Sequence, residues 1–148
     1  MSGLFRPSAS VSRRIAGGAL GALVLGLSAL SAQAAPKPAP VDAAKLALGE
    51  RAFAQCKGCH NLQAGAADMV GPNLYGIYDK KAGSNSATYN YSTAMRAYGV
   101  TWDDQTLSTF LQGPSKAVPG TKMPYRGLSD DATRAALVYY IKIKSTQK

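Results

Sequence analysis

Three residues that can bind a prosthetic group stand together in this chain, at Cys56, Cys59 and His60. The sequence contains two cysteines and one histidine in all, and this cluster uses every one of them. The spacing Cys-x-x-Cys-His is the pattern of covalent haem attachment, in which two thiols add to the vinyl groups of one haem. The adjacent histidine then becomes an axial ligand of the iron. The sequence therefore predicts one covalently bound haem c, with His60 as a ligand of its iron.

Three other kinds of site also use a Cys-x-x-Cys pair, and the rest of the sequence disfavours each of them. A structural zinc site normally has four cysteine or histidine ligands, and this chain has three such residues. A thioredoxin-like dithiol lies near a βαβ unit, and we find no convincing parallel-strand runs. A disulfide between Cys56 and Cys59 would leave the adjacent His60 without a role. Haem attachment is the interpretation that explains all three residues.

The sixth coordination position of the iron decides between two classes of function. A strong second ligand would make an electron carrier, whereas an exchangeable position would indicate a haem peroxidase or a gas sensor. No second histidine exists, so methionine is the natural candidate. Met123 lies in a loop that can cover the haem face opposite His60, and we predict it as the second ligand. Met95 is the alternative, although we expect it to pack in the core.

The first 34 residues have the features of a secretory signal peptide. Basic residues come first, an apolar run over 15–30 follows, and Ala-Gln-Ala at 32–34 is a cleavage site. The apolar run is shorter than the roughly 20 residues of a membrane-spanning helix, so we expect cleavage rather than a retained anchor. These features predict Sec-type export to the periplasm, with no stable insertion in the membrane after cleavage.

Removal of residues 1–34 would leave a basic chain. Residues 35–42 are then a Pro/Ala-rich leader, and 43–148 are expected to form one domain. Three of the 17 Lys and Arg residues lie in the first 34, and all eight Asp and Glu residues lie beyond them, so the remainder has a net charge of +6. The chain has no dense Lys/Arg run with interleaved aromatic residues, which argues against a nucleic-acid partner. An acidic docking protein is the partner that this charge favours.

Helix signals dominate the sequence after the leader. Asp42 is placed to cap a helix over about 43–56, and Gly49 on its apolar face indicates the close approach of another helix. A short helix over about 92–98 is expected to stop at Gly99. The apolar face of the first helix is predicted to consist of Leu46, Gly49, Phe53 and Cys56.

Two further helices are predicted in the second half of the chain. One begins at a capping-box pattern over 101–104 and ends at Gly113-Pro114. It is expected to bury Leu107, Phe110 and Leu111, and a loop over 115–128 is expected to follow it. The last begins at a Ser129 cap, with Ala136, Tyr139, Tyr140 and Ile143 on its apolar face. The long loops between the helices need an internal reason, and a central haem is such a reason. The sequence therefore predicts an all-α domain of four to five helices and long loops around one covalent haem.

Several ordered blocks make the chain resemble the class I c-type cytochromes, of the small soluble bacterial type similar to mitochondrial cytochrome c. Gly49-Glu50-Arg51-Ala52-Phe53 precedes the attachment motif, and Gly71-Pro72-Asn73-Leu74 begins eleven residues after His60. Tyr91, Trp102 and Thr121-Lys122-Met123 follow in order. The resemblance covers about 43–144 and implies the cytochrome c fold with a His60/Met123-ligated iron.

The resemblance also implies roles for four further pocket residues. The Pro72 carbonyl is expected to accept a hydrogen bond from His60 Nδ1, which would orient the ring. Tyr91 and Trp102 are expected to hydrogen-bond a buried haem propionate, and Thr121 the inner propionate or a buried water. Three departures from the family pattern stand at Phe110, Lys80 and Pro124.

The resemblance implies an electron-transfer protein rather than an enzyme, acting as a monomeric periplasmic one-electron shuttle. Its partners would be the acidic docking surfaces of a dehydrogenase, a bc-type complex, a terminal oxidase or a photosynthetic reaction centre. A subunit held within a larger redox complex is the other alternative. The lysines that we expect around the exposed haem edge are Lys57, Lys80, Lys81, Lys116 and Lys122.

Overall fold

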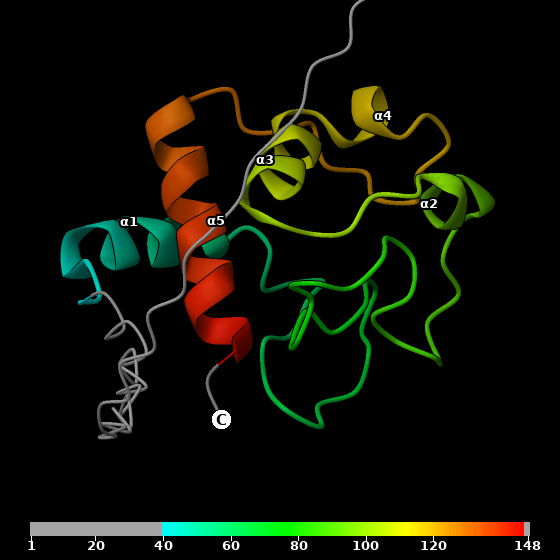
Figure 1. Cartoon of the computed structure of the whole chain (residues 1–148), viewed down its shortest axis with the longest axis horizontal. Coiled ribbons are helices and arrows are strands. Elements are labelled where there is room, and N and C mark those ends of the chain that lie inside the picture. The colour runs from blue at the N-terminus through cyan, green and yellow to red at the C-terminus, as the bar shows by residue number, and fades with distance from the viewer. Residues whose placement is uncertain (1–39, 147–148) are drawn as a thin grey trace, which may run out of the picture. The chain divides into compact units, whose positions relative to one another are not determined.

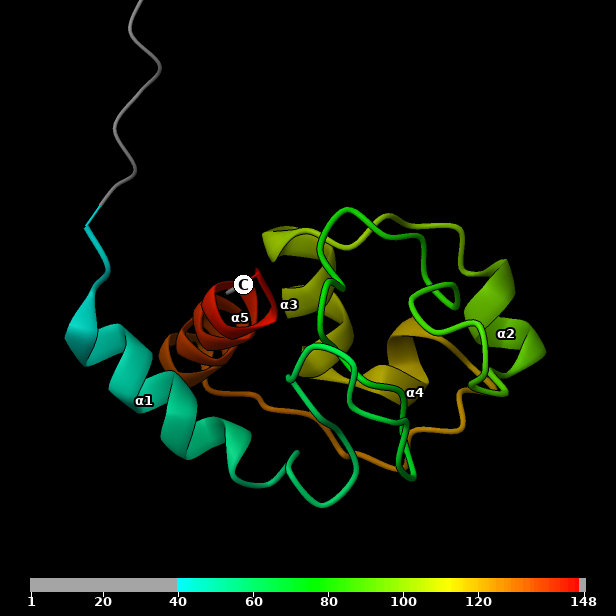
Figure 2. The same cartoon turned by 90° about the horizontal axis from the view of Figure 1, so that it is seen from below.

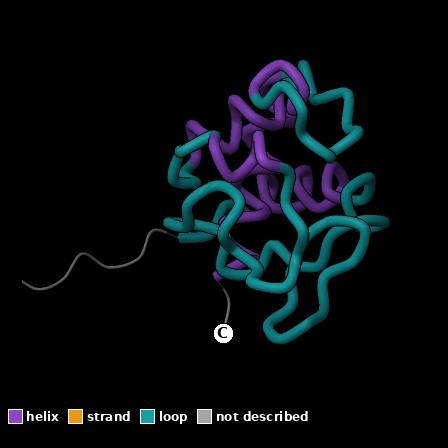
Figure 3. The backbone as a smooth tube through the Cα atoms, turned by 90° about the vertical axis from the view of Figure 1, so that its right-hand side faces the viewer, coloured by secondary structure: helices purple, strands orange, loops and turns teal. Residues whose placement is uncertain are grey.

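The computed structural model of the protein describes residues 40–146 as a helical unit. Its helices, in chain order, are α1 (Ala43–Phe53), α2 (Thr93–Ala97), α3 (Asp104–Gln112), α4 (Pro114–Ala117) and α5 (Asp131–Thr146) (Figure 1). Within 40–146 no segment forms a strand, and loops make up a large part of the trace (Figure 3). The predicted all-α class with four to five helices is therefore confirmed.

The N-terminal predictions fall mostly outside this range. The expected signal peptide at 1–34 and the first part of the 35–42 leader lie outside the described residues. Among the residues that are described, no helix is long and apolar enough to cross a membrane.

Helix α1 begins where the sequence predicted and ends earlier. The Asp42 carboxylate accepts a hydrogen bond from the Lys45 amide at 2.9 Å, which satisfies one of the free donors of the first turn. The helix was expected to reach about Cys56, but it stops at Phe53. Tight turns follow, because the Cys56 amide donates to the Phe53 carbonyl and the Cys59 amide to the Cys56 carbonyl. The attachment motif therefore lies on these turns and not on the helix itself.

Gly49 allows α1 to pack directly against α5, as the sequence indicated. A Cβ at this position would overlap the Ala136 carbonyl oxygen and lie 2.6 Å from the Tyr140 Cβ. Phe53 and Tyr140 pack nearby with ring centroids 5.4 Å apart. Figure 2 shows the two helices side by side, in agreement with their contacts. Helix α3 contacts α5 as well, so α5 is the element shared by the other two long helices.

Two predicted helix starts were wrong by one or two residues. Helix α3 is capped by Asp103, whose carboxylate accepts from the Thr106 amide at 2.7 Å, and not by the expected box over 101–104. At α5 the Asp130 carboxylate accepts from the Thr133 amide at 2.7 Å, where Ser129 was expected to cap. Both corrections have the same cause: a carboxylate one or two residues closer to the helix accepts the first-turn amide.

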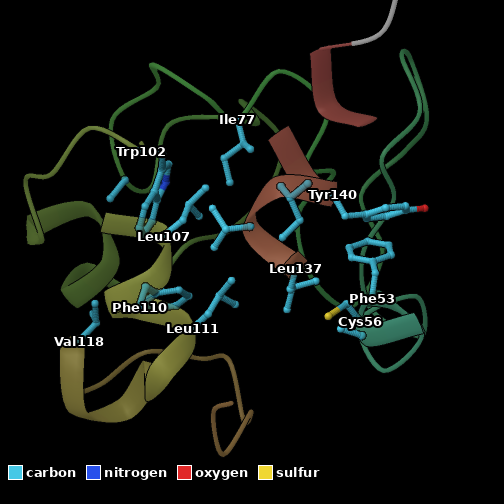
Figure 4. Packing of buried hydrophobic residues seen from close by; sticks show 14 residues of the cluster. Phe53, Cys56, Ile77, Trp102, Leu107, Phe110, Leu111, Val118, Leu137 and Tyr140 are labelled. Carbon is cyan, nitrogen blue, oxygen red and sulfur yellow. The ribbon is translucent and has the colours of Figure 1, made fainter. Parts of the chain in front are cut away.

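The buried face of α5 also differs from the prediction. Ala136 and Tyr140 are buried as expected, whereas Tyr139 and Ile143 are half-buried. The buried hydrophobic residues of this helix are Ala136, Leu137, Val138, Tyr140 and Ile141. Leu137 is fully buried and stands between the two groups of core residues in Figure 4, with Phe53 and Cys56 on one side and Trp102 and Phe110 on the other.

Helix α4 was not expected, because 115–128 was predicted to be a loop. The Gly113-Pro114 pair ends α3 and at once begins α4, with Pro114 in the first turn, where its missing N–H costs nothing. The expected burial of Leu107, Phe110 and Leu111 on α3 is confirmed.

Candidate haem site

All eight residues predicted for the site line one cavity of about 290 Å³. They come from the turns after α1, the loops on either side of α2, and the loop after α4. The remaining wall is mostly apolar and includes Phe53, Leu74, Ile77, Leu107, Phe110, Leu111 and Ile141. A concave, mainly apolar cavity with a few placed polar groups is typical of a cofactor site. The eight residues are Cys56, Cys59, His60, Pro72, Tyr91, Trp102, Thr121 and Met123.

His60 is held as a neutral imidazole with one nitrogen available to a metal. Its Nδ1 lies 2.8 Å from the Pro72 carbonyl oxygen, and because a carbonyl can only accept, Nδ1 carries the proton. The hydrogen bond expected between these two residues is therefore present. Burial lowers the pKa of His60, and the bond to Pro72 opposes this in part. The lone pair is then on Nε2, the nitrogen that can bind iron.

Gly71 packs directly against the His60 ring. A Cβ at Gly71 would lie 2.7 Å from His60 Nδ1, so any larger residue would displace the ring. The Gly71 amide also donates to the Cys59 carbonyl at 2.9 Å, which ties the loop to the attachment motif.

The two cysteines lie on one turn with His60. The amides of Cys59 and His60 both donate to the Cys56 carbonyl at 3.0 Å. Within the described part of the chain, no disulfide joins Cys56 and Cys59. Burial, and secondarily the neighbouring Cys59, raises the pKa of the Cys56 thiol to about 11. Cys56 is therefore a protonated thiol at neutral pH before any covalent attachment.

Two methionines, Met95 and Met123, line the cavity. Met69 is not in the cavity wall and is 45% exposed. The Met123 amide donates to the Thr121 hydroxyl oxygen at 3.3 Å, and the Lys122 ammonium donates to the Asn90 carbonyl at 2.8 Å. The loop that carries Met123 is thus tied to the loop that precedes α2.

Two of the three residues expected near the propionates, Tyr91 and Thr121, have a hydroxyl group with a proton left to donate. Tyr91 Oη accepts a hydrogen bond from the Ser86 amide at 3.2 Å, and Thr121 Oγ1 accepts from the Met123 amide. Each hydroxyl can therefore still donate toward the cavity. Trp102 is 4% exposed and packs against Phe110, with ring centroids 5.4 Å apart.

Tyr125 is a cavity residue that the sequence analysis missed. Its hydroxyl is buried and, among the residues that the structure describes, has no hydrogen-bond partner. Burial and the nearby Cys56 raise the pKa of Tyr125; Gln55 offsets part of this increase without completing a hydrogen bond. A buried hydroxyl without a hydrogen-bond partner costs free energy. An unpaired hydroxyl at this position is what we expect if the cavity holds a further group. Its position two residues after Met123 was the available signal.

The expected lysines do not share one cavity rim. Lys122 lines the cavity described above, and Lys57 lines a second one of about 610 Å³. Lys80, Lys81 and Lys116 are exposed and line neither.

These observations agree with a covalently bound haem. Two thiols and a neutral imidazole lie on one turn, a glycine leaves space beside the imidazole, and an apolar cavity opens in front of them. The cavity provides soft and neutral iron ligands in its histidine and methionines. A porphyrin with two thioether links needs such a set of residues.

Comparison with known proteins gives the same result. The family model described as cytochrome c matches residues 46–144. Cytochrome c2 from Blastochloris viridis is 38% identical over 120 residues, covering 81% of this chain and 91% of that protein. Cytochrome c from Ginkgo biloba is 39% identical over 101 residues, covering 68% and 88%.

A solved structure is also similar. Cytochrome cH from Methylobacterium extorquens superimposes with a TM-score of 0.62 at 42% identity, covering 66% of this chain and 97% of that one. Taken with the cavity, these matches show that the chain is a class I c-type cytochrome: a member of the cytochrome c family with the cytochrome c fold and one covalently bound haem c, and a small electron-transfer protein rather than an enzyme.

Proposed function

We propose that this cytochrome is a monomeric periplasmic one-electron carrier in which His60 and Met123 are the axial ligands of the haem iron. The observation that carries the proposal is that both residues line the same cavity as Cys56 and Cys59, although Met123 comes from a loop far along the chain. Met123 is preferred over Met95 because its loop follows the family pattern Thr-Lys-Met.

The bound haem supplies an iron that takes up and gives back one electron. His60 and Met123 are both neutral, so neither has to gain or lose a proton when the charge on the iron changes. The Pro72 carbonyl fixes the orientation of the His60 ring and strengthens it as a donor. The apolar cavity wall excludes water. A thioether ligand favours the reduced iron, which raises the potential relative to two histidines.

The remaining pocket residues would bind and orient the haem. Cys56 and Cys59 would hold it through thioether links. Tyr91, Trp102 and Thr121 would donate hydrogen bonds to its carboxylates, and the free hydroxyl protons of Tyr91 and Thr121 support this role.

The charge of the chain favours acidic partners. With residues 1–34 removed, the net charge is +6, so acidic docking surfaces on redox partners would be attracted over long range. A dehydrogenase, a bc-type complex, a terminal oxidase and a photosynthetic reaction centre are the partner classes that we propose. Such contacts should be small and short-lived, because a carrier must leave quickly.

Export and processing are part of the proposal. The predicted cleavage after Ala34 would deliver a chain whose folded domain spans 43–148. Intact-mass measurement of the protein purified from the periplasmic fraction tests this: a mass corresponding to residues 35–148 plus one haem is expected, and a full-length membrane-bound chain would contradict it.

The ligand assignment is tested by optical spectra of the oxidised, haem-loaded protein and two methionine variants. Wild type should have the weak far-red band of a sulfur-to-iron bond. Met123→Ala should lose that band, because the ligand is removed. Met95→Ala is the matched control, since Met95 lines the same cavity, and it should keep the band. Loss of the band in Met95→Ala and its retention in Met123→Ala would contradict the assignment.

A further inference from the structure

One carboxylate joins two loops that come together beside the haem cavity. Asp68 Oδ2 accepts hydrogen bonds from the hydroxyls of Ser86 at 2.6 Å and Thr88 at 2.8 Å. Asp68 Oδ1 accepts from the Asn73 amide at 2.9 Å, next to the Pro72 that orients His60. The three donors lie on two segments, so one side chain links the loop after the attachment motif to the loop before α2.

Both the side chain and the backbone amide of Ser86 are held by hydrogen bonds. Its hydroxyl donates to Asp68 and accepts from the Tyr89 amide at 3.2 Å. Its own amide donates to Tyr91 Oη at 3.2 Å. The Ser86 side chain is thus held by a strong, charge-assisted hydrogen bond to Asp68, while the amide of the same residue contacts Tyr91.

The contact with Ser86 determines how Tyr91 can use its hydroxyl. The Tyr91 hydroxyl oxygen accepts the hydrogen bond from the Ser86 amide, so its own proton points in another direction. Tyr91 lines the haem cavity, and the cavity is where this proton can be donated. Burial raises the pKa of Tyr91, and the nearby negative charge of Asp68 also contributes to the increase. The hydroxyl therefore remains a proton donor at neutral pH.

We propose that Asp68 is a positioning residue for the haem site: acting through Ser86, it orients the Tyr91 hydroxyl so that this donates into the cavity, to a haem carboxylate. The inference rests on the proposed function for the identity of the acceptor. The relay Asp68–Ser86–Tyr91 itself consists of hydrogen bonds within the chain.

The structure offers a matched control for the charge. Asp103 also accepts two hydrogen bonds from its own neighbourhood, from the Thr106 amide and the Thr106 hydroxyl at 2.7 and 2.8 Å. Like Asp68, it does not itself line the cavity, but its hydrogen bonds stay within the start of α3. Asp68→Asn and Asp103→Asn therefore remove the same charge and comparable hydrogen bonds, but Asp68→Asn alone breaks the relay.

The first measurement is hydrogen exchange at the Ser86 amide in the haem-loaded protein. Asp68→Asn and Tyr91→Phe should both accelerate it, roughly tenfold for the loss of a hydrogen bond to or through a charged group. Asp103→Asn should leave it unchanged. If Asp68→Asn leaves Ser86 exchange at the wild-type rate, the relay does not exist. This readout does not depend on the sixth iron ligand or on a redox partner, so it can fail while the proposed function stands.

The second measurement is the reduction potential in a double-mutant cycle. Asp68→Asn should shift the potential when Tyr91 is present and should shift it much less when Tyr91→Phe is also present. A shift of the same size in both backgrounds, matching that of Asp103→Asn, would mean that Asp68 acts by its charge alone and would overturn the proposal. Ser86→Ala, which removes the middle hydroxyl and leaves Asp68 intact, should reproduce the Asp68→Asn shift and serves if that variant does not load haem.

Discussion

The haem site requires a residue without a side chain at Gly71. A Cβ there would lie 2.7 Å from His60 Nδ1, so Gly71→Ala must push the imidazole away from the Pro72 carbonyl. We expect less haem-loaded protein and a free energy of unfolding lower by about 1–3 kcal/mol, the usual cost of overpacking. Chemical denaturation and the haem-to-protein absorbance ratio would measure both.

Gly58→Ala is the control for this prediction. It lies in the same motif, but an added Cβ there meets no atom within 4 Å. Equal stability and equal loading of the two variants would mean that the contact with His60 does not matter.

Asp68 should make the stability of the protein depend on acidic pH. Hydrogen bonds from Ser86, Asn73 and Thr88 lower the pKa of its carboxyl in the folded state. A lowered pKa contributes stability above the unfolded value, and that contribution is lost as pH falls through the folded value. Asp68→Asn should therefore be less stable than wild type at pH 7, with the gap closing below about pH 4. Urea unfolding across that range measures it, and a gap that is independent of pH would contradict the prediction.

Single residues differ in how far the sequence could identify them. Cys56, Cys59 and His60 were predictable because their spacing along the chain is itself the chemical signature. Tyr125 and Asp68 were not, because their importance arises from contacts between segments that are distant in sequence. For Asp68 the one available signal was a carboxylate in a Gly/Ala-rich loop of a chain with eight acidic residues.

At the scale of elements, the crossing of α1 and α5 is the contact that fixes the helical frame. Gly49→Ala would gain about 1 kcal/mol in helix propensity. It would also force a methyl group against the Ala136 carbonyl and the Tyr140 Cβ, which should cost more. We expect a net loss of about 1–2 kcal/mol in the free energy of unfolding, measured by denaturant titration.

Ala47→Gly reports the propensity effect alone, since Ala47 lies on α1 and is exposed. This variant should lower the free energy of unfolding by about 1 kcal/mol, the cost of glycine at a helix position that has no close neighbour. A Gly49→Ala protein more stable than wild type would show that the two helices can separate freely.

The four longer helices were predictable from the sequence, whereas the short helix α4 and several helix boundaries were not. Asp42 caps its helix as predicted, since it stands alone as a cap-forming residue before an apolar pattern. Ser92 caps α2 through its hydroxyl, although it was expected inside the helix and not at its cap. Before α3 and α5, several cap-forming residues stand in a row, and local sequence does not rank Thr101 against Asp103 or Ser129 against Asp130. Packing against the rest of the chain makes that choice.

On the scale of the whole molecule, positive charge should control the encounter with small redox reagents. Oxidation by an anionic reagent such as ferricyanide should become slower as ionic strength rises, because attraction to the positively charged chain, which is +9 in full and +6 after the proposed removal of residues 1–34, is screened. Reaction with a cationic ruthenium hexaammine reagent should become faster. Stopped-flow rates over a series of salt concentrations test both slopes, and equal slopes for the two reagents would contradict steering by net charge.

The loops could be predicted as long but not as ordered. Asn73 donates to the carbonyls of Gln63 and Ala66, and Asn85 donates to those of Asn73 and Tyr75. These side-chain amides donate hydrogen bonds to loop carbonyls, which in a strand or a helix would accept hydrogen bonds from the backbone. Nothing in the spacing of Asn, Gly and Ser specifies such pairs, which is why the sequence indicated loops around a haem without indicating what holds them together.

In the proposed carrier the protein itself fills both axial positions of the iron. This can be checked with the spectrum of the reduced, haem-loaded wild-type protein before and after addition of carbon monoxide. A one-electron carrier with His60 and Met123 as ligands predicts a low-spin spectrum that does not change. Rapid formation of a carbon monoxide adduct would show an exchangeable position and would contradict the carrier in favour of a gas sensor or a peroxidase.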